Sequence, residues 1–246
     1  MIKLFARKQR TIFHITHWKA GSQWLNKIIK SVAPDAVVHA MVDEVQFRDN
    51  SIQESKIYTA LYVTKEKYDL VSVPPNSKKF IIIRDLRDTL ISAYFSLKIS
   101  HPVLDNRIEE WRKHLNQVAL EAGLIYLMEK WLPYCANIQW SWLLSGEKLY
   151  KYEELLDDDV HMLKMILIDK CKMDISSNEL EKAIISHRFI NMTNGRARGV
   201  EDVTAHARKG IAGDWENYFT DEVKAMFKIY YGDLLIASGY EQSFKW

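Results

Sequence analysis

The chain has 246 residues, 48% hydrophobic and 27% charged, a composition typical of a folded globular protein and unlike that of a disordered one. Its formal net charge of +2 is too small to indicate general attraction to nucleic acid, so we expect no nucleic-acid partner, and any anion site must depend on a local cluster of cations. No run approaches the roughly 20 apolar residues that span a bilayer, and the opening MIKLFARKQR lacks a signal peptide's apolar stretch, so we expect a cytoplasmic protein.

Strands and helices alternate along the first half of the chain. An apolar strand pattern after Arg10 gives way to a helical pattern from Ser22 to about Val32, and short strand patterns follow in AVVHA, KIYTALYV and DLVSV. The β-branched run KKFIIIR is typical of a strand buried on both faces of a parallel sheet, and DLRDTLISAYFSLK continues it as a helix. The order strand, polar turn, helix therefore occurs twice.

The second half of the chain is predicted to be mainly helical. Helical patterns cover 107–142, EKLYKY adds a strand, and helices return in EELLDDDVHMLKMILIDKC and SSNELEKAII. The stretch 191–214 is rich in Gly and Arg without a sustained period, which predicts a long and functional loop. A last helix follows Thr220 as N-cap. We expect one α/β domain over 1–246, with a central parallel β-sheet flanked by helices.

The two cysteines, Cys135 and Cys171, belong to no CxxC or Cys/His grouping. Neither a disulfide framework nor a zinc site is supported, and we expect two reduced thiols in or near the core.

The first strand-to-helix turn, THWKAGSQW, has the features of a phosphate site. Gly21 allows the backbone to approach an anion, the helix begins with free N–H groups, and Lys19 and Ser22 add a cation and a hydroxyl. It is not a Walker A sequence, because Lys19 precedes Gly21 and no upstream glycine is present. A solvated surface lysine is the alternative interpretation.

The second turn, in IIIRDLRDTLIS, places Arg84 at the end of a buried strand and Ser92 on the helix that follows. Ligands of open parallel sheets gather at the carboxyl ends of the strands, so two such turns can converge on one anionic ligand. A partly buried guanidinium needs a partner, which could be a phosphate or a neighbouring carboxylate, Asp85 or Asp88. The residues alone leave both readings open.

A third basic site lies in the long loop, where Arg208 and Lys209 precede Gly210 in ARKGIAGDWENYFT. Three separate sites with cations and glycines suggest a ligand with more than one phosphate-like group.

These motifs carry a resemblance. HWKAGSQWL resembles the 5'-phosphosulfate loop YPKSGTTWL of sulfotransferases, RDLRDTLISAYF resembles their 3'-phosphate motif RNPKDVAVSYYHF, and RKGIAGDWENYFT is similar to their C-terminal RKGxxGDWKNxFT. LYKYEELLDD and SHRFINMTN also resemble the family's YEDL strand end and HTSFxxM segment. The ordered set spans most of the chain and identifies it as a member of the cytosolic-type sulfotransferase family, with a P-loop nucleotide-binding-like fold.

The resemblance implies that the chain transfers the sulfuryl group of 3'-phosphoadenosine 5'-phosphosulfate (PAPS) to a hydroxyl or amine of a small-molecule acceptor by in-line displacement, leaving 3'-phosphoadenosine 5'-phosphate (PAP) and requiring no metal. Lys19 would face the bridging oxygen and sulfonate as a catalytic residue. The implied cofactor-binding residues are Gly21, Ser22 and Gln23 at the 5'-phosphate, Arg84, Ser92, Arg208, Lys209 and Gly210 at the 3'-phosphate, and Trp24, Tyr152 and Phe189 at the adenine. Core packing is the alternative for the three aromatic residues.

The sequence departs from the family in its proton acceptor. Ala20 and Gln23 replace a serine and a threonine of the lysine loop, and KIYTALYV lacks the histidine of the family's KTHLP-like segment. An acceptor alcohol still needs a base within hydrogen-bond reach. We predict His39 as this catalytic base, with Glu44 or Asp43 as the alternative; His14 and His17 are weaker candidates.

Other readings remain. A catalytically inactive nucleotide-binding protein would keep the donor motifs and lack the family histidine, whereas a P-loop phosphotransferase is disfavoured by the missing Walker motifs. The acceptor cannot be identified, because the aromatic helices over 111–142 could line an acceptor pocket or form core. The family also forms homodimers, but its KxxxTVxxxE signal has no counterpart in FTDEVKAMFKIYYGDL, so dimerisation is left open.

Overall fold

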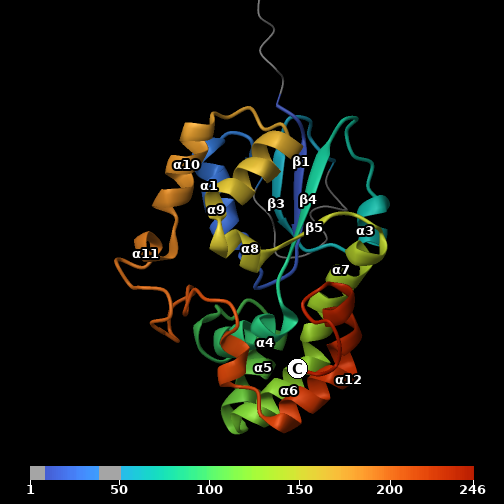
Figure 1. Ribbon diagram of the computed structural model, residues 1–246, viewed down its shortest axis with the longest axis vertical. Helices are drawn as coiled ribbons and strands as arrows, with labels where there is room; N and C mark the ends of the chain where they lie inside the picture. The colour runs from blue at the N-terminus through green and yellow to red at the C-terminus, as the bar shows by residue number, and fades with distance from the viewer. Residues whose placement is uncertain (1–8, 39–50) are drawn as a thin grey trace, which may run out of the picture.

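The computed structural model describes residues 9–38 and 51–246, which form a parallel sheet above a layer of helices (Figure 1). Five strands lie in the order β2-β3-β1-β4-β5: β2 (Val37–Val38), β3 (Ile57–Leu61), β1 (Ile12–Thr16), β4 (Lys78–Ile83) and β5 (Leu149–Lys151). All four pairings are parallel, with Ile12 opposite both Ile57 and Lys78. The predicted α/β fold with a central parallel sheet is therefore confirmed.

The segment DLVSV forms no strand, contrary to the prediction. Its first residue, Asp69, is the last residue of the helix α3 (Lys65–Asp69), which the Thr64 side chain caps. The remaining residues, 70–73, form a loop. Val71 and Val73 still pack against the face of the sheet from this loop. Their apolar alternation therefore reflects burial without strand pairing.

One face of the sheet is covered by α1 (Ser22–Val32), α8 (Tyr152–Asp157), α9 (Asp159–Leu163), the π-helical segment η2 (Lys164–Lys170) and α10 (Ser177–Ser186). Ile12, Ile57 and Phe80 point to this face, where Leu25 and Ile28 of α1 pack against them. Ser176 and Glu179 form a capping box that begins α10. The first helix has the predicted bounds because its apolar residues recur at helical spacing.

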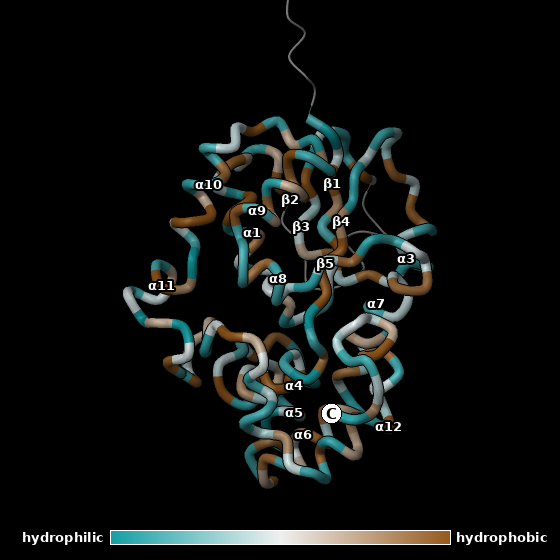
Figure 2. The backbone as a smooth tube through the Cα atoms, in the orientation of Figure 1, coloured by the Kyte–Doolittle hydropathy of each residue, from teal (hydrophilic) through white to brown (hydrophobic). Residues whose placement is uncertain are grey.

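The opposite face packs against α3 and α7 (Leu132–Leu144). Phe13, Ile15 and Ile81 alternate with the residues of the first face and contact Trp142 of α7, whose indole N–H donates to the carbonyl of Val63. Hydrophobic residues collect around the strands in Figure 2 because both faces are covered.

A helical layer lies beyond the carboxyl ends of the strands (Figure 1). It contains α4 (Leu86–Phe95), its π-helical extension η1 (Ser96–Ser100), α5 (Asn106–Gln117), α6 (Leu120–Lys130), the short 3-10 helix η3 (Asp214–Asn217) and α12 (Asp221–Ala237). Thr220 caps α12 as predicted. The small helix α11 (Phe189–Met192) opens the predicted long loop, which reaches back toward α4.

Both cysteines are buried free thiols, as expected. In the ranges 9–38 and 51–246, no helix is long and apolar enough to cross a bilayer.

Candidate active site

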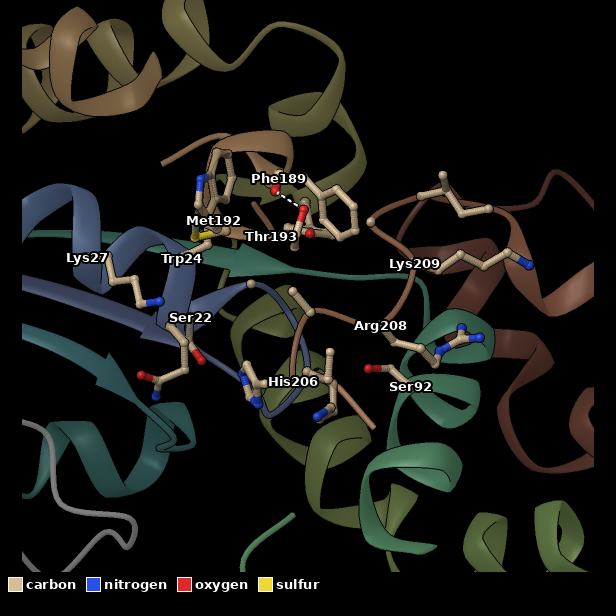
Figure 3. A pocket seen from close by; sticks show the side chains of 18 of the residues that line it. Ser22, Trp24, Lys27, Ser92, Phe189, Met192, Thr193, His206, Arg208 and Lys209 are labelled. Carbon is tan, nitrogen blue, oxygen red and sulfur yellow. Dashed lines mark hydrogen bonds between the residues drawn. The ribbon is translucent and has the colours of Figure 1, made fainter. Parts of the chain in front are cut away.

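One cavity of about 610 Å³ opens at the carboxyl ends of the strands, between the sheet and the helical layer. Every predicted donor-binding residue lies on its wall, and these residues come from four separate parts of the chain. Figure 3 labels Ser22, Trp24, Ser92, Phe189, Arg208 and Lys209 among them. They are Lys19, Gly21, Ser22, Gln23, Trp24, Arg84, Ser92, Tyr152, Phe189, Arg208, Lys209 and Gly210. The parallel topology brings them together, because the strand-to-helix turns of such a sheet share one edge.

Lys19 lies in the turn between β1 and α1 and has a positive φ of 67°. Such a conformation costs about 1–3 kcal/mol for a residue other than glycine and is found mainly where function requires it. It turns the Lys19 carbonyl toward Arg84, whose Nη1 donates to it at 2.9 Å. The Lys19 ammonium has no hydrogen bond or ion pair with another described residue. Burial, followed by the charge of Arg84, lowers its pKa to about 8.

The helix α1 begins with unsatisfied backbone donors. Its N-cap is Gly21, which has a φ of 77° and offers no side chain to the first N–H groups, and the first turn contains no acidic residue. These N–H groups have no intrahelical acceptor, so they are available to an anion. The Ser22 hydroxyl lies 2.8 Å from the Tyr62 hydroxyl at the same end of the helix.

Gly21 also lies directly against the ring of Tyr152, at the first turn of α8. A Cβ at Gly21 would lie 2.4 Å from Cε2 of that ring, which no side chain can accept without displacement of the ring. The guanidinium of Arg84 lies over the same ring at 5.0 Å. The Tyr152 ring therefore packs against both the lysine turn and the Arg84 side chain.

Arg84 directly follows β4, and its side chain is only 12% exposed. Its partners among the described residues are the Lys19 carbonyl and the carboxylate of Asp88, 3.7 Å away, while its buried Nε has no hydrogen bond. The sequence left a phosphate or a carboxylate open as its partner, and the contact with Asp88 is long for an ion pair. Arg84 can therefore still donate to an anion in the cavity.

Arg87, in the same turn, does not reach the cavity. It pairs with Asp85 and Glu241, and its guanidinium lies between the rings of Trp215 and Trp246 at 4.1 and 4.5 Å. It fastens the C-terminal end of the chain to α4, and only one of the two arginines of this turn faces the ligand site.

The loop with Arg208 and Lys209 carries its own counterions. The carboxylate of Asp214, 2% exposed, accepts from both cations, and Glu201 also accepts from Arg208. The hydrogen bond to Asp214 raises the pKa of Lys209. Burial alone would raise the pKa of the Asp214 carboxyl, but the hydrogen bonds from Lys209 and Arg208 outweigh burial and lower it. These cations are thus positioned before a ligand arrives.

Two sets of hydrogen bonds fix this loop, one to α4 and one within the loop itself. Asp88 of α4 accepts from the backbone N–H groups of Gly213 and Trp215 at 2.8 and 3.0 Å. Arg196 donates to the carbonyls of Val200, Ala207 and Arg208, and so closes the loop on itself. The loop is irregular in backbone conformation but fixed by side chains.

The aromatic wall of the cavity is built by Trp24 of α1 and Phe189 of α11. Arg188, one residue earlier, pairs with Asp159 at 2.8 Å and anchors α11 to α9. A Cβ at Gly210 would lie 2.4 Å from the Phe189 ring, so the Arg208-Lys209-Gly210 segment packs directly on this residue. Trp24 lies edge-on to Tyr152, with ring centroids 6.3 Å apart.

The predicted proton acceptors are not placed. His39, Asp43 and Glu44 lie outside the described residues, so their role stays a prediction. His17 is buried, with Nε2 accepting from the Arg84 N–H at 3.0 Å and Nδ1 at 2.9 Å from the Trp18 carbonyl; burial lowers its pKa to about 4. His14 accepts from the Ala60 N–H and stacks on Phe80 inside the sheet. Both are structural.

Sequence reasoning missed several residues on the cavity wall. They include a cation on α1, two histidines and polar residues of the long loop: Lys27, His101, Thr193, Arg198 and His206. The composition of the long loop was the only signal for the last three. Within the described residues, no group of three or more His, Cys, Asp or Glu side chains is arranged to hold a metal ion.

Comparison with known proteins identifies the family to which the chain belongs. The model of the family described as "Sulfotransferase domain" matches residues 9–239. Over 94% of its length the chain is 19% identical to sulfotransferase 1E1 of Rattus norvegicus, covering 85% of that protein; over 88% of its length it is 24% identical to sulfotransferase 2A1 of Homo sapiens, covering 81%.

A solved structure shares the fold. Mouse sulfotransferase SULT7A1, complexed with PAP, superposes with a TM-score of 0.67 and 22% identity, over 98% of this chain and 89% of that one.

Proposed function

The chain belongs to the sulfotransferase domain family and is a PAPS-dependent sulfotransferase, and we propose that the cavity described above is its donor site. The mouse relative of similar fold is complexed with PAP, which supports a nucleotide of this kind as the ligand. The acceptor is a small molecule with a hydroxyl or amine. Dimerisation, a cytoplasmic location and independence of metal ions stay predictions from the sequence.

At the 5' end of the donor, the turn between β1 and α1 binds the phosphosulfate. The N–H groups at the start of α1, the Ser22 hydroxyl and the Gln23 amide donate to the 5'-phosphate. Lys19 stabilises the negative charge that develops on the bridging oxygen as the sulfur–oxygen bond breaks. Its ammonium is preorganised by the turn and pairs with no carboxylate of residues 9–38 and 51–246, as electrostatic stabilisation of a transition state requires.

At the other end, Arg84, Ser92, Arg208, Lys209 and the Gly210 backbone hold the 3'-phosphate. Arg84 and the loop cations approach from different elements, and a planar guanidinium can donate to two phosphate oxygens at once. Trp24, Tyr152 and Phe189 contact the adenine, as the resemblance implies.

The observation that carries the proposal is the convergence of all twelve predicted residues on one cavity wall. They arise from the β1–α1 turn, the β4–α4 segment, the start of α8 and the loop around α11. Their four cations and three aromatic rings line the same cavity, which fits a nucleotide with more than one phosphate-like group.

Calorimetric titration tests the donor site. PAP is compared with 5'-AMP, which lacks the 3'-phosphate, and with adenosine 2',5'-bisphosphate, which has the same number of phosphates at a different position. We expect PAP to bind about 10- to 100-fold more tightly than either, because charged hydrogen bonds to the 3'-phosphate are lost or misplaced. The Lys209→Ala variant should remove most of this preference, and Lys130→Ala, an exposed lysine of α6, should not.

Equal affinity for the three nucleotides would contradict the assignment of the 3'-phosphate residues. Absence of PAP binding in the folded protein would overturn the donor site as a whole.

A further inference from the structure

The described structure has no histidine in the segment where the family carries its base. β3 and the residues after it, 57–63, contain none. His14 of β1 and His17, which directly follows this strand, are buried with structural roles. A hydroxyl acceptor is a poor nucleophile unless a base takes its proton, so the cavity itself has to be searched for one. Two histidines lie on its wall, His101 and His206.

His206 lies two residues before Arg208, on the segment that carries the predicted 3'-phosphate contacts. The Arg196 guanidinium donates to the carbonyls of Ala207 and Arg208, which fixes the backbone immediately after His206. In the view of Figure 3 its ring is drawn between Ser22 on one side and Ser92 and Arg208 on the other. Its ring nitrogens make no hydrogen bond with a described residue, so they remain available to an acceptor.

Burial and the neighbouring cations both favour the neutral form of the His206 ring. Burial lowers the pKa of His206 from the ordinary 6.5, and the groups that add to this effect are Lys19 of the first turn, His101 after η1 and Lys27 of α1, in that order. The nearby carboxylate of Asp202 is engaged by the N–H and hydroxyl of Thr204. A neutral imidazole close to the catalytic lysine can accept a proton at neutral pH.

We propose that His206 is the proton acceptor of the sulfuryl transfer, supplied by the C-terminal loop in place of the family's histidine. A ring nitrogen of His206 takes the proton of the acceptor hydroxyl as its oxygen attacks the sulfur. The bond between sulfur and the bridging oxygen breaks, its electron pair stays on the 5'-phosphate beside Lys19, and the imidazolium then releases its proton to solvent. The products are a sulfate ester, PAP and a proton. This inference rests on the proposed donor site.

His101 is the competing residue on the same wall. Its Nδ1 lies 2.7 Å from the Pro102 carbonyl, which holds Nδ1–H as a donor and leaves Nε2 as an acceptor. His206 differs from His101 in its place on the chain: it lies two residues before Arg208, on the loop that carries the predicted 3'-phosphate contacts, and Lys19 is among the groups that lower its pKa. The proposal therefore assigns His206, and His101 is tested beside it as a competing residue of the same cavity wall.

The test measures transfer from PAPS in the full chain and in His206→Asn, with His101→Asn, His39→Asn and Glu44→Gln as competing variants. His161→Asn, an exposed histidine of α9, is the matched control. The acceptors are a panel of neutral alcohols and phenols. A further acceptor, 4-nitrophenol, is used at an assay pH at which its hydroxyl is already ionised. Hydrolysis of PAPS is followed in the same samples, so that water serves as acceptor even if the panel does not.

We expect His206→Asn to lower kcat about 100-fold or more for neutral acceptors and for water, and only a few-fold for the ionised nitrophenol, with PAP affinity unchanged. The acid limb of the wild-type pH profile should lie below 6.5 and disappear in this variant. Equal loss for both kinds of acceptor, normal activity, or a larger loss in one of the competing variants would overturn the assignment of His206. Failure of the wild-type protein to bind PAP would instead overturn the proposed donor site.

Discussion

Lys19 and Lys209 both line the donor cavity, yet in the described part of the chain only Lys209 is paired with a carboxylate. Asp214 raises the pKa of Lys209 and keeps it charged, whereas burial and Arg84 lower the pKa of Lys19 to about 8. The difference follows the chemistry proposed for each end. A cation that binds a permanent phosphate can be held in place by a counterion, while one that stabilises charge appearing only during reaction has to remain uncompensated.

The largest effect is expected for Lys19→Met. Removing the single cation at the bridging oxygen should lower kcat by about 10²- to 10³-fold, as loss of one transition-state donor does, and should change PAP affinity much less. Transfer kinetics and calorimetry on the same samples measure the two quantities. Lys30→Met, an exposed lysine of α1, is the control. A loss of PAP affinity as large as the loss of kcat would make Lys19 a ground-state binding residue.

The low pKa of Lys19 predicts a pH dependence. A lysine is charged below its pKa, so kcat/KM should be sustained up to about pH 8 and fall about tenfold per pH unit above it. Lys19→Arg, whose charge persists at high pH, should remove this fall even if its rate is lower. The pH profile of kcat/KM for PAPS, measured with saturating acceptor, tests this fall above pH 8. A flat profile up to about pH 10 would show that Lys19 titrates as an ordinary lysine.

Gly21→Ala tests the contact between the lysine turn and Tyr152. The added Cβ would meet the ring at 2.4 Å, so we expect about a tenfold loss of PAP affinity as the turn or the ring moves. Gly146→Ala is the matched control, because Gly146 has a similar φ of 72° and nothing within 4 Å of an added Cβ. Calorimetry, with thermal unfolding of both variants, separates the steric effect from backbone strain. Equal PAP affinity in the two variants would exclude the steric effect.

The smallest effect concerns the counterions of the C-terminal loop. Glu201, which is partly exposed, shares Arg208 with Asp214 and would compete with a 3'-phosphate for it. Glu201→Gln should tighten PAP binding about two- to fivefold, in keeping with the modest strength of exposed ion pairs. Weaker binding would mean that Glu201 holds Arg208 in its binding position.

The sequence predicted much of this architecture because the relevant patterns are local. The bounds of α1, the buried run of β4 and the Thr220 cap follow from apolar spacing and capping chemistry. The prediction of a strand in DLVSV was wrong, because alternation of apolar residues indicates burial and does not establish a strand partner. Strand pairing depends on residues distant in the sequence.

The sequence predicted which residues form the site, but it did not predict which of its cations are paired with carboxylates. Motifs located Lys19, Arg84 and Lys209, whereas the pairing of Lys209 with Asp214 depends on how the loop folds. For His206 the composition of the long loop was the only signal, because its proposed role depends on a place on the cavity wall that only the fold creates.

The most direct test of the unpaired lysine is its side-chain titration. Lysine labelled at Cε is followed by NMR in the free protein and in the protein saturated with PAP, with Lys19→Met used to assign the signal. We predict that Lys19 titrates near pH 8 in the free protein and at higher pH with PAP, because the bound phosphate favours the charged ammonium. Titration of Lys19 together with the exposed lysines, unchanged by PAP, would contradict the assignment of this residue to the donor's phosphosulfate.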